Sequence, residues 1–156
     1  MSHTKEPEGF GFLVTDTARL LRNEFDRLIT EAGLGLTPGE ARTLSHAARA
    51  GTVRQAALAE RMGVEAMTLS AYLDRLEGRG LVVRTPDPAD RRAKLVHLTE
   101  AADEVLARMQ DISRILRQRA SRSLKPAEFE MLQALLRRVR ADLQEGRDED
   151  RKSSAA

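Results

Sequence analysis

The fold is decided by the stretch "LAERMGVEAMTLSAYLDRLEGRGLVVRTPDPADRRAKLVHLTE", residues 58–100. Apolar periodicity predicts one helix over residues 55–62 and a second over residues 65–79, with only Gly63 and Val64 between them. Two short helices joined by a tight turn that contains glycine are typical of a helix-turn-helix.

A β-hairpin is expected directly after the second helix. Residues 81–83 are β-prone, and "KLVHL" at residues 94–98 alternates apolar and polar positions as a half-buried strand does. Between them "PDPAD" favours a turn, because its prolines lack an N–H and its aspartates can accept hydrogen bonds from nearby backbone. Three cations follow: Arg91 and Arg92 at the tip and Lys94 at the base. A hairpin placed behind a helix-turn-helix has the layout of a wing.

The helix over residues 65–79 has two different faces. Leu69, Leu73 and Leu76 recur at the spacing of a buried stripe. The other face carries small residues and hydroxyls that allow close approach to another surface, and Thr68 and Ser70 can join backbone N–H groups in holding a phosphate. The alternative is a solvated helix whose small residues only favour helicity. For this helix alone, both interpretations stay open.

Amphipathic helices flank this motif. Before it, a long helix from about residue 9 to residue 32 ends at the glycines of "GLGL", and a second helix starts at Pro38. Thr37 is a good N-cap for that helix, and Glu40 stands at the position that completes a capping box.

Two more helices are expected after Thr99, which can cap the first of them. The last helix spaces its apolar residues three and four apart, at Phe129, Leu132, Leu136, Val139 and Leu143. This spacing is that of a coiled-coil seam. Either the chain closes the seam itself, as in an ordinary bundle, or a second copy closes it.

The composition favours a mainly α chain (α+β). Its 156 residues fit one domain, and a 41% hydrophobic content with only 3% aromatics favours amphipathic helices. The absence of cysteine excludes disulfides, thiolate metal sites and thiol-based redox sensing. No apolar run approaches the ~20 residues that span a bilayer, so we expect no membrane partner and a cytoplasmic location.

The net charge of +2 lies in the middle third of the chain. Residues 51–98 hold eight basic and six acidic side chains, so the remainder sums to zero. Such an excess is weak evidence for a polyanionic partner, since most surface charges are simply solvated. The order of the elements therefore has to carry the functional argument.

Together the motifs resemble the MarR family of winged helix-turn-helix transcription regulators. The similarity lies in "DRLEGRGLV", in the wing "DPADRRA" and in "LTEA", and the flanking helices extend it over about residues 10–145. The resemblance implies a winged helix-turn-helix lobe with a long-helix dimerisation region. Its expected segments are a flexible N-terminus (1–8), an N-terminal dimerisation helix (9–36), the DNA-binding lobe (37–98), C-terminal dimerisation helices (99–145) and a flexible tail (146–156).

The resemblance implies a homodimer that binds double-stranded DNA, acts in the cytoplasm at the nucleoid, and is expected to be a repressor. A two-fold dimer should bind a pseudo-palindromic operator whose half-sites lie about 10 bp apart. The dimer is expected to use Leu13, Leu20, Leu116, Phe129, Leu132, Leu136, Val139 and Leu143.

Roles on DNA follow from the same resemblance. The recognition helix would enter the major groove with Glu65, Ala66, Met67, Thr68, Ser70, Ala71 and Arg75, of which Thr68, Ser70 and Arg75 are favoured for phosphates or base edges. Arg54 and Gln55 would hold the DNA backbone. In the wing of Asp90, Arg91, Arg92 and Lys94, we expect Arg92 to enter the minor groove and Asp90 to restrain a neighbouring arginine.

The recognition helix departs from the family pattern. Positions that are often polar in relatives are here Ala66 and Met67, with Ala71 further along and the acidic Glu65 at the start. Direct hydrogen bonding to bases is therefore expected to be sparse, and groove shape and the wing should supply much of the selectivity.

The sequence also bears on a possible effector and on two alternative functions. By resemblance, a small aromatic or anionic effector could release the DNA, with His46 as a candidate polar group in its pocket; a lone helical histidine is more often a packing residue. No cofactor or metal is expected, because His3, His46 and His97 are scattered in the sequence. A winged-helix protein–protein module without DNA binding is the alternative, and an enzyme is disfavoured because no catalytic motif is present.

Overall fold

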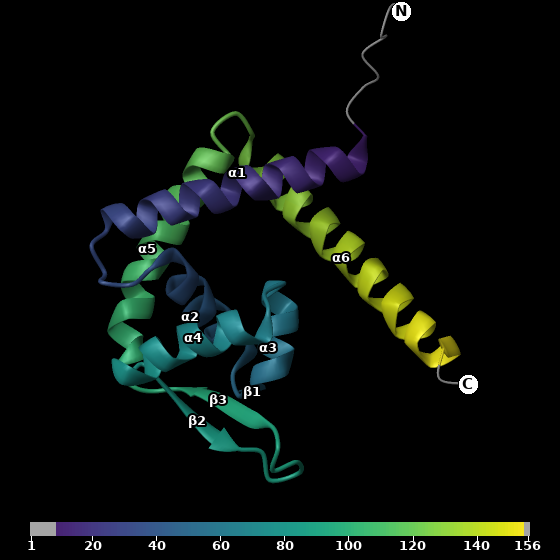
Figure 1. The fold of residues 1–156 in the computed structure, drawn as a ribbon. Helices are drawn as coiled ribbons and strands as arrows, with labels where there is room; N and C mark the ends of the chain where they lie inside the picture. The colour runs from purple at the N-terminus through teal and green to yellow at the C-terminus, as the bar shows by residue number, and fades with distance from the viewer. Residues whose placement is uncertain (1–8, 155–156) are drawn as a thin grey trace, which may run out of the picture. The chain divides into compact units, whose positions relative to one another are not determined.

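The computed structural model describes residues 9–154, so His3 and the expected flexible segment 1–8 lie outside the described part. The chain is mainly helical with one small sheet, as predicted (Figure 1). In chain order the elements are α1 (Phe10–Glu31), α2 (Pro38–Ala50), β1 (Val53–Arg54), α3 (Gln55–Met62), α4 (Ala66–Gly78), β2 (Val82–Pro86), β3 (Lys94–Leu98), α5 (Ala102–Ala120) and α6 (Pro126–Ser154). Two compact units divide the chain after Leu116, within α5.

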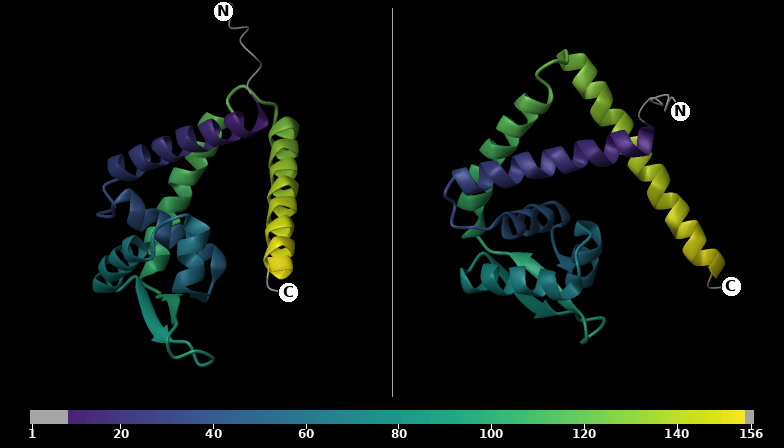
Figure 2. Two further views of the ribbon diagram at one scale, coloured as in Figure 1. Left: turned by 45° about the vertical axis from the view of Figure 1, so that its right-hand side comes forward. Right: turned by 45° about the horizontal axis from the view of Figure 1, so that its top comes forward.

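The hairpin of β2 and β3 projects from the helices of the first unit (Figure 2). The strands pair antiparallel from Val82 opposite Leu98 to Pro86 opposite Lys94. β3 also pairs antiparallel with the two-residue strand β1, where Val53 lies opposite Val96. Sequence analysis missed β1, because two residues are too few to show alternation and only the partner strand makes them extended.

The capping box at the start of α2 is present as predicted. The Thr37 hydroxyl accepts from the Glu40 backbone N–H at 3.3 Å, and the Glu40 carboxylate accepts from the Thr37 N–H at 3.1 Å. These reciprocal bonds satisfy N–H groups that the first turn of a helix otherwise leaves unpaired.

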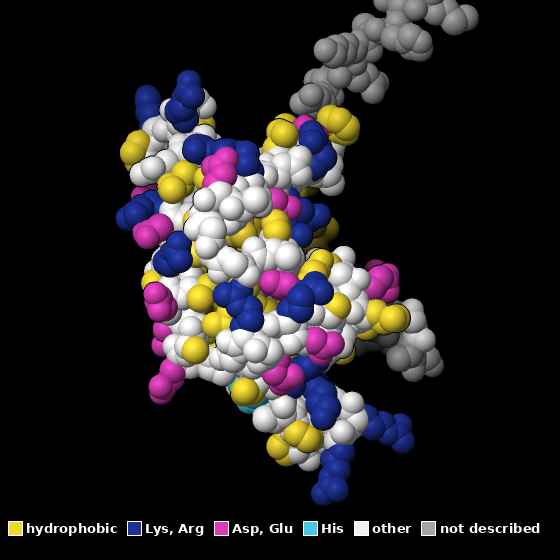
Figure 3. Space-filling model, turned by 60° about the vertical axis from the view of Figure 1, so that its left-hand side comes forward, with side chains coloured by type: hydrophobic (Ala, Val, Ile, Leu, Met, Phe, Trp, Pro, Cys, Tyr) yellow, Lys and Arg dark blue, Asp and Glu magenta, His cyan; other side chains and the backbone are white. Residues whose placement is uncertain are grey.

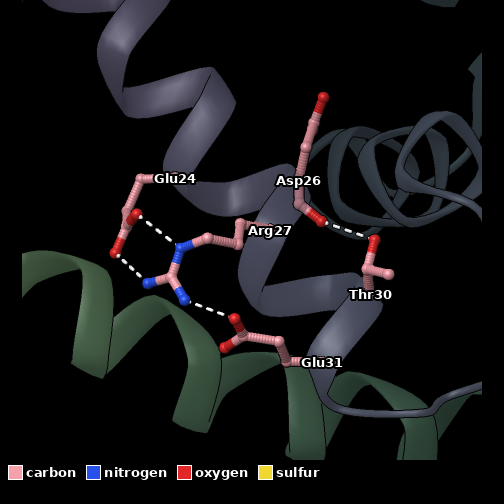
Figure 4. Close-up of polar contacts among 5 residues, drawn as sticks. All are labelled: Glu24, Asp26, Arg27, Thr30 and Glu31. Atoms are coloured by element: carbon pink, nitrogen blue, oxygen red, sulfur yellow. Dashed lines mark hydrogen bonds and ion pairs between the residues drawn. The ribbon is translucent and has the colours of Figure 1, made fainter.

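α1 is held by polar contacts on its own surface, by the shared core and by an ion pair to α2. Figure 4 shows the Arg27 guanidinium between the carboxylates of Glu24 and Glu31, one turn away on either side. Thr30 donates its hydroxyl to the Asp26 carbonyl at 2.9 Å. The Asp26 carboxylate also accepts from Arg42, which fixes the end of α1 against α2. Exposed ion pairs within one helix stabilise it only modestly, because water screens the charges.

One hydrophobic core serves the first unit. It draws on every helix and strand up to α5, including Ile29, Leu44, Leu58, Val82, Val96 and Ile112. The predicted buried stripe of α4 is confirmed, because Leu69, Leu73 and Leu76 are all fully buried. The recognition helix is thus anchored by its apolar face.

The second unit contains the end of α5 and the whole of α6. Several apolar side chains of α6 remain in water: Leu132, Leu136 and Leu143 are 41%, 45% and 66% exposed. α6 is helical through Ser154, past residue 145, where we expected the last helix to end. No described helix is long and apolar enough to cross a membrane.

Candidate nucleic-acid interface

A left-handed glycine makes the turn between α3 and α4. Gly63 has a φ of 62°, which favours glycine, and it ends α3 by donating its N–H to the Glu60 carbonyl at 3.1 Å. The Val64 N–H donates to the Ala59 carbonyl at 3.2 Å. α4 then begins at Ala66 with Glu65 at its N-cap position, so the predicted helix-turn-helix is confirmed.

The outer face of α4 is open to solvent. Ala66, Met67 and Thr68 at its start are exposed, and the Met67 side chain reaches 86% exposure. Ser70 and Ala71 lie half-buried at the edge of this face. The first turn of α4 therefore presents two apolar side chains and one hydroxyl, but no cation, to solvent.

Arg75 is the one cation of the predicted contact set on α4, and its side chain is held in place. Its Nε–H donates to the buried carboxylate of Glu40 in α2, and its guanidinium lies 5.6 Å from the centre of the Tyr72 ring. The side chain is 54% exposed. The sequence contained no signal for the Glu40 contact, because 35 positions separate the two residues.

Arg54 also has a partner that sequence analysis did not identify. At the start of α3, its Nε–H donates at 2.6 Å to the Asp87 carboxylate in the wing. The other Asp87 oxygen accepts from the Ala89 N–H at 2.8 Å. The bond from Ala89 and then the one from Arg54 lower the pKa of the Asp87 carboxyl below its ordinary value. Arg54 thus fixes the wing, while half of its side chain stays exposed; its neighbour Gln55 is half-buried.

Backbone hydrogen bonds close the wing tip. Asp87 donates its N–H to the Ala93 carbonyl at 3.0 Å, and Ala93 donates to the Asp90 carbonyl at 2.9 Å. The Asp90 side chain accepts from the Arg92 backbone N–H at 3.0 Å. Asp90 therefore restrains Arg92 as expected, but through the backbone, not through an ion pair with a guanidinium.

The side chains at the wing tip are unpaired cations. Arg91 and Arg92 are exposed, and neither guanidinium has a protein partner within the described residues. Lys94 is exposed at the start of β3. Figure 3 shows basic side chains that project from the hairpin at the bottom of the molecule. The hairpin thus presents three exposed cations, at its tip and at the start of β3.

The base of the wing is bonded to the recognition helix. Arg84 in β2 forms ion pairs at 2.6 Å with both Asp74 and Glu77 of α4, and its N–H donates to Glu77 at 3.0 Å. These bonds from Arg84 hold the pKa of the Glu77 carboxyl below its ordinary value. Helix and wing are consequently linked by polar contacts as well as by the shared core.

His46 and His97 are the two histidines that the structure describes, and they lie on different elements, α2 and β3. In the described part of the chain, no group of three or more His, Asp or Glu residues converges as a metal site would require. His97 lies between the hydroxyls of Thr52 and Thr85, at 3.3 Å and 2.9 Å. His46 is half-buried in α2, where burial and then nearby arginines, Arg49 first, lower its pKa.

A helix-turn-helix followed by a cation-tipped wing defines a winged helix-turn-helix protein, and comparisons with known proteins identify the family. Residues 36–94 match the model of the MarR family. A Thauera aromatica protein, described as a transcriptional regulatory protein for the hcr operon, is 34% identical over 116 residues, which are 74% of this chain and 69% of that protein. The chain therefore belongs to the MarR family of transcriptional regulators.

Solved structures agree with that assignment. The transcriptional regulator PA3341 is 36% identical, with a TM-score of 0.72 over 88% of this chain and 99% of its own. A crystal structure of MarR has a TM-score of 0.79 over 95% of this chain and 99% of its own, at 23% identity, and supports the fold alone. The chain is thus a MarR-type transcriptional regulator and does not belong to an enzyme family.

Proposed function

We propose that this regulator is a homodimeric repressor that binds a pseudo-palindromic operator and releases it on binding a small aromatic or anionic effector. One observation supports DNA binding most directly: the solvent-exposed face of α4 and the wing-tip arginines, which have no partner among the described residues, lie on the same lobe. Contacts between α4 and the wing limit their independent movement, so both can engage one duplex.

In this proposal α4 enters the major groove. Thr68, Ser70 and Arg75 donate to phosphates or base edges, since hydroxyls and guanidinium groups serve both purposes. Ala66, Met67 and Ala71 supply apolar contacts such as those with thymine methyl groups, and Glu65 can accept from cytosine. Because the exposed turn at the start of α4 lacks a cation, base-specific hydrogen bonds are few and DNA shape contributes much of the selectivity.

The wing supplies the second group of contacts. Arg92 enters the minor groove, where a narrow A·T-rich segment concentrates negative potential, and Arg91 and Lys94 lie near the phosphates. Arg54 and Gln55 approach the DNA backbone at the start of α3. Arg54 can do so only with its outer nitrogens, because its Nε–H is bonded to Asp87.

A second copy of the chain is the proposed partner of the long helices. On α1, Leu13 and Leu20 are 52% and 54% exposed, and most of the predicted seam residues on α6 also lie in water. Burying a leucine side chain contributes ~1.5–3 kcal/mol, so these surfaces favour association. Phe129 and Val139 are half-buried. Leu116 packs against the core of its own chain, which gives it a structural role besides the predicted one.

His46 is the proposed polar contact for the effector. His46 is half-buried and forms no hydrogen bond within the described part of the chain, so its imidazole is available to a ligand. Because its pKa is lowered, the imidazole is mainly neutral at physiological pH and can accept a hydrogen bond. A ligand releases DNA only if it binds the DNA-free conformation more tightly than the DNA-bound one.

Selection of bound sequences from a random DNA pool tests the function. The expected result is a pseudo-palindrome with half-sites about 10 bp apart and a binding constant that falls steeply with salt. Sedimentation of the free protein should give a dimer. Failure to enrich any sequence, together with a flat salt dependence, would support the protein–protein module instead.

A further inference from the structure

The first turn of α2 holds the recognition helix through one buried carboxylate. Glu40 is only 4% exposed, and each of its two oxygens accepts a hydrogen bond. Oε2 accepts from the Thr37 N–H at 3.1 Å, and Oε1 accepts from the Arg75 Nε–H. The same side chain therefore caps α2 and binds α4.

The neighbouring residue completes the contact between the two helices. Gly39 lies so close to Tyr72 that an added β-carbon would be 2.4 Å from the ring, and the Arg75 guanidinium lies over that ring. Arg79, after the end of α4, donates to the carbonyls of Leu34 and Gly35 in the preceding loop. Residues 34–40 thus contact Tyr72 and Arg75 within α4 and Arg79 just after its end.

These contacts orient the Arg75 side chain. Its Nε–H donates to Glu40 and its Cζ lies over the Tyr72 ring, 5.6 Å from the ring centre, whereas its two Nη groups have no protein partner among the described residues. A guanidinium is a rigid planar fork, so holding its Nε edge on Glu40 beside the Tyr72 ring restricts the direction of the remaining donors. An exposed arginine without such contacts would lose rotamer entropy on binding DNA.

We propose that Glu40 is a positioning residue for DNA recognition: it holds Arg75 with both Nη groups directed to an acceptor on the duplex. This inference rests on the proposed function and names a residue that contacts no DNA itself. Its physical basis is preorganisation, which reduces the entropy lost when the complex forms.

Charge and orientation predict opposite outcomes when the carboxylate is removed. If Glu40 only neutralised Arg75 and capped α2, losing its negative charge would raise DNA affinity, because the duplex is a polyanion. If Glu40 orients Arg75, losing the charge should lower operator affinity in spite of that electrostatic gain. The direction of the change therefore discriminates between the two roles.

The test uses Glu40→Gln in the full-length chain and the operator selected from random DNA. Glutamine keeps a carbonyl oxygen for the Thr37 N–H but loses the charged acceptor for Arg75. Fluorescence anisotropy should show operator binding weakened about fivefold to tenfold, as for the loss of an oriented charged hydrogen bond. In an Arg75→Ala background, the same substitution should cause no weakening. Thermal denaturation checks that each variant is folded.

Two further variants sharpen the result. Arg75→Lys keeps the charge without the planar fork, so it should weaken binding about as much as Glu40→Gln does. Glu100→Gln, an exposed carboxylate after the wing, is the control for losing one negative charge and should leave affinity unchanged or slightly higher. If Glu40→Gln loses affinity for the operator and for random DNA alike, the acceptor of Arg75 is a phosphate. If it loses affinity for the operator alone, the acceptor is a base edge. Both results support the proposal.

Three outcomes overturn it. If Glu40→Gln binds the operator at least as tightly as the unmodified protein, Glu40 only neutralises the charge of Arg75 and does not orient it. If Glu40→Gln weakens operator binding equally in the Arg75→Ala background, Glu40 acts only as a helix cap. If Arg75→Lys binds the operator as tightly as the unmodified protein, recognition does not depend on the orientation of a guanidinium. If the unmodified protein selects no DNA at all, the proposed function fails together with this inference, whereas the other results leave the proposed function intact.

Discussion

Replacing Gly39 by alanine tests how closely α2 approaches the recognition helix. The added β-carbon would lie 2.4 Å from Cζ of Tyr72 and 2.6 Å from Cε1 and Oη, well inside van der Waals contact. The ring can relieve this clash only by moving from its place, and it carries the Arg75 guanidinium on its face.

Two effects of the substitution oppose each other. Alanine is favoured over glycine within a helix by up to ~1 kcal/mol. Overpacking a well-filled contact costs ~1–3 kcal/mol. We therefore expect Gly39→Ala to lower the free energy of unfolding by about 1–2 kcal/mol, although alanine is the better helix former.

A double-mutant cycle with Tyr72→Ala isolates the clash. Once the ring is absent, only helix propensity remains, so Gly39→Ala should raise the free energy of unfolding in that background, by up to ~1 kcal/mol. Urea denaturation of the four proteins at one protomer concentration measures both steps, because dimer stability depends on concentration. Equal destabilisation in both backgrounds, or stabilisation of the unmodified protein, would show that the close approach to Tyr72 is not the cause.

Other predictions concern the wing and the dimer. Arg92→Ala should weaken operator binding by ~1–3 kcal/mol for each wing, measured by fluorescence titration, and an unchanged affinity would exclude the wing from recognition; Arg122→Ala, outside the winged lobe, is the charge-matched control. The pKa of Asp87 is lower in the folded protein than the unfolded value of about 3.9, so the Asp87 carboxylate stabilises the fold above that pH. This stabilisation is lost as the pH falls through the folded pKa. The free energy of unfolding, followed below pH ~4, should therefore depend less on pH in Asp87→Asn than in the unmodified protein. Leu136→Glu should shift the protein toward monomer in sedimentation, and an intact dimer would place the interface elsewhere.

Much of the DNA-binding lobe could be predicted from local patterns. The buried stripe of α4, the glycine turn before it, the capping box of α2 and the proline-rich wing tip each depend on residues a few positions apart. Such features follow from helical periodicity, side-chain geometry and the missing N–H of proline, all of which can be recognised in a sequence.

Only the tertiary structure decided which partners the cations of the candidate interface have. The Arg75–Glu40 and Arg54–Asp87 contacts join residues 35 and 33 positions apart, and β1 is extended only because β3 pairs with it. No local pattern specifies such pairs, because they form only when the shared core brings separate elements together. By itself the sequence determined where the cations stand along the chain. Packing determined that the wing-tip arginines remain unpaired, whereas Arg54 and Arg75 are each held by a buried carboxylate.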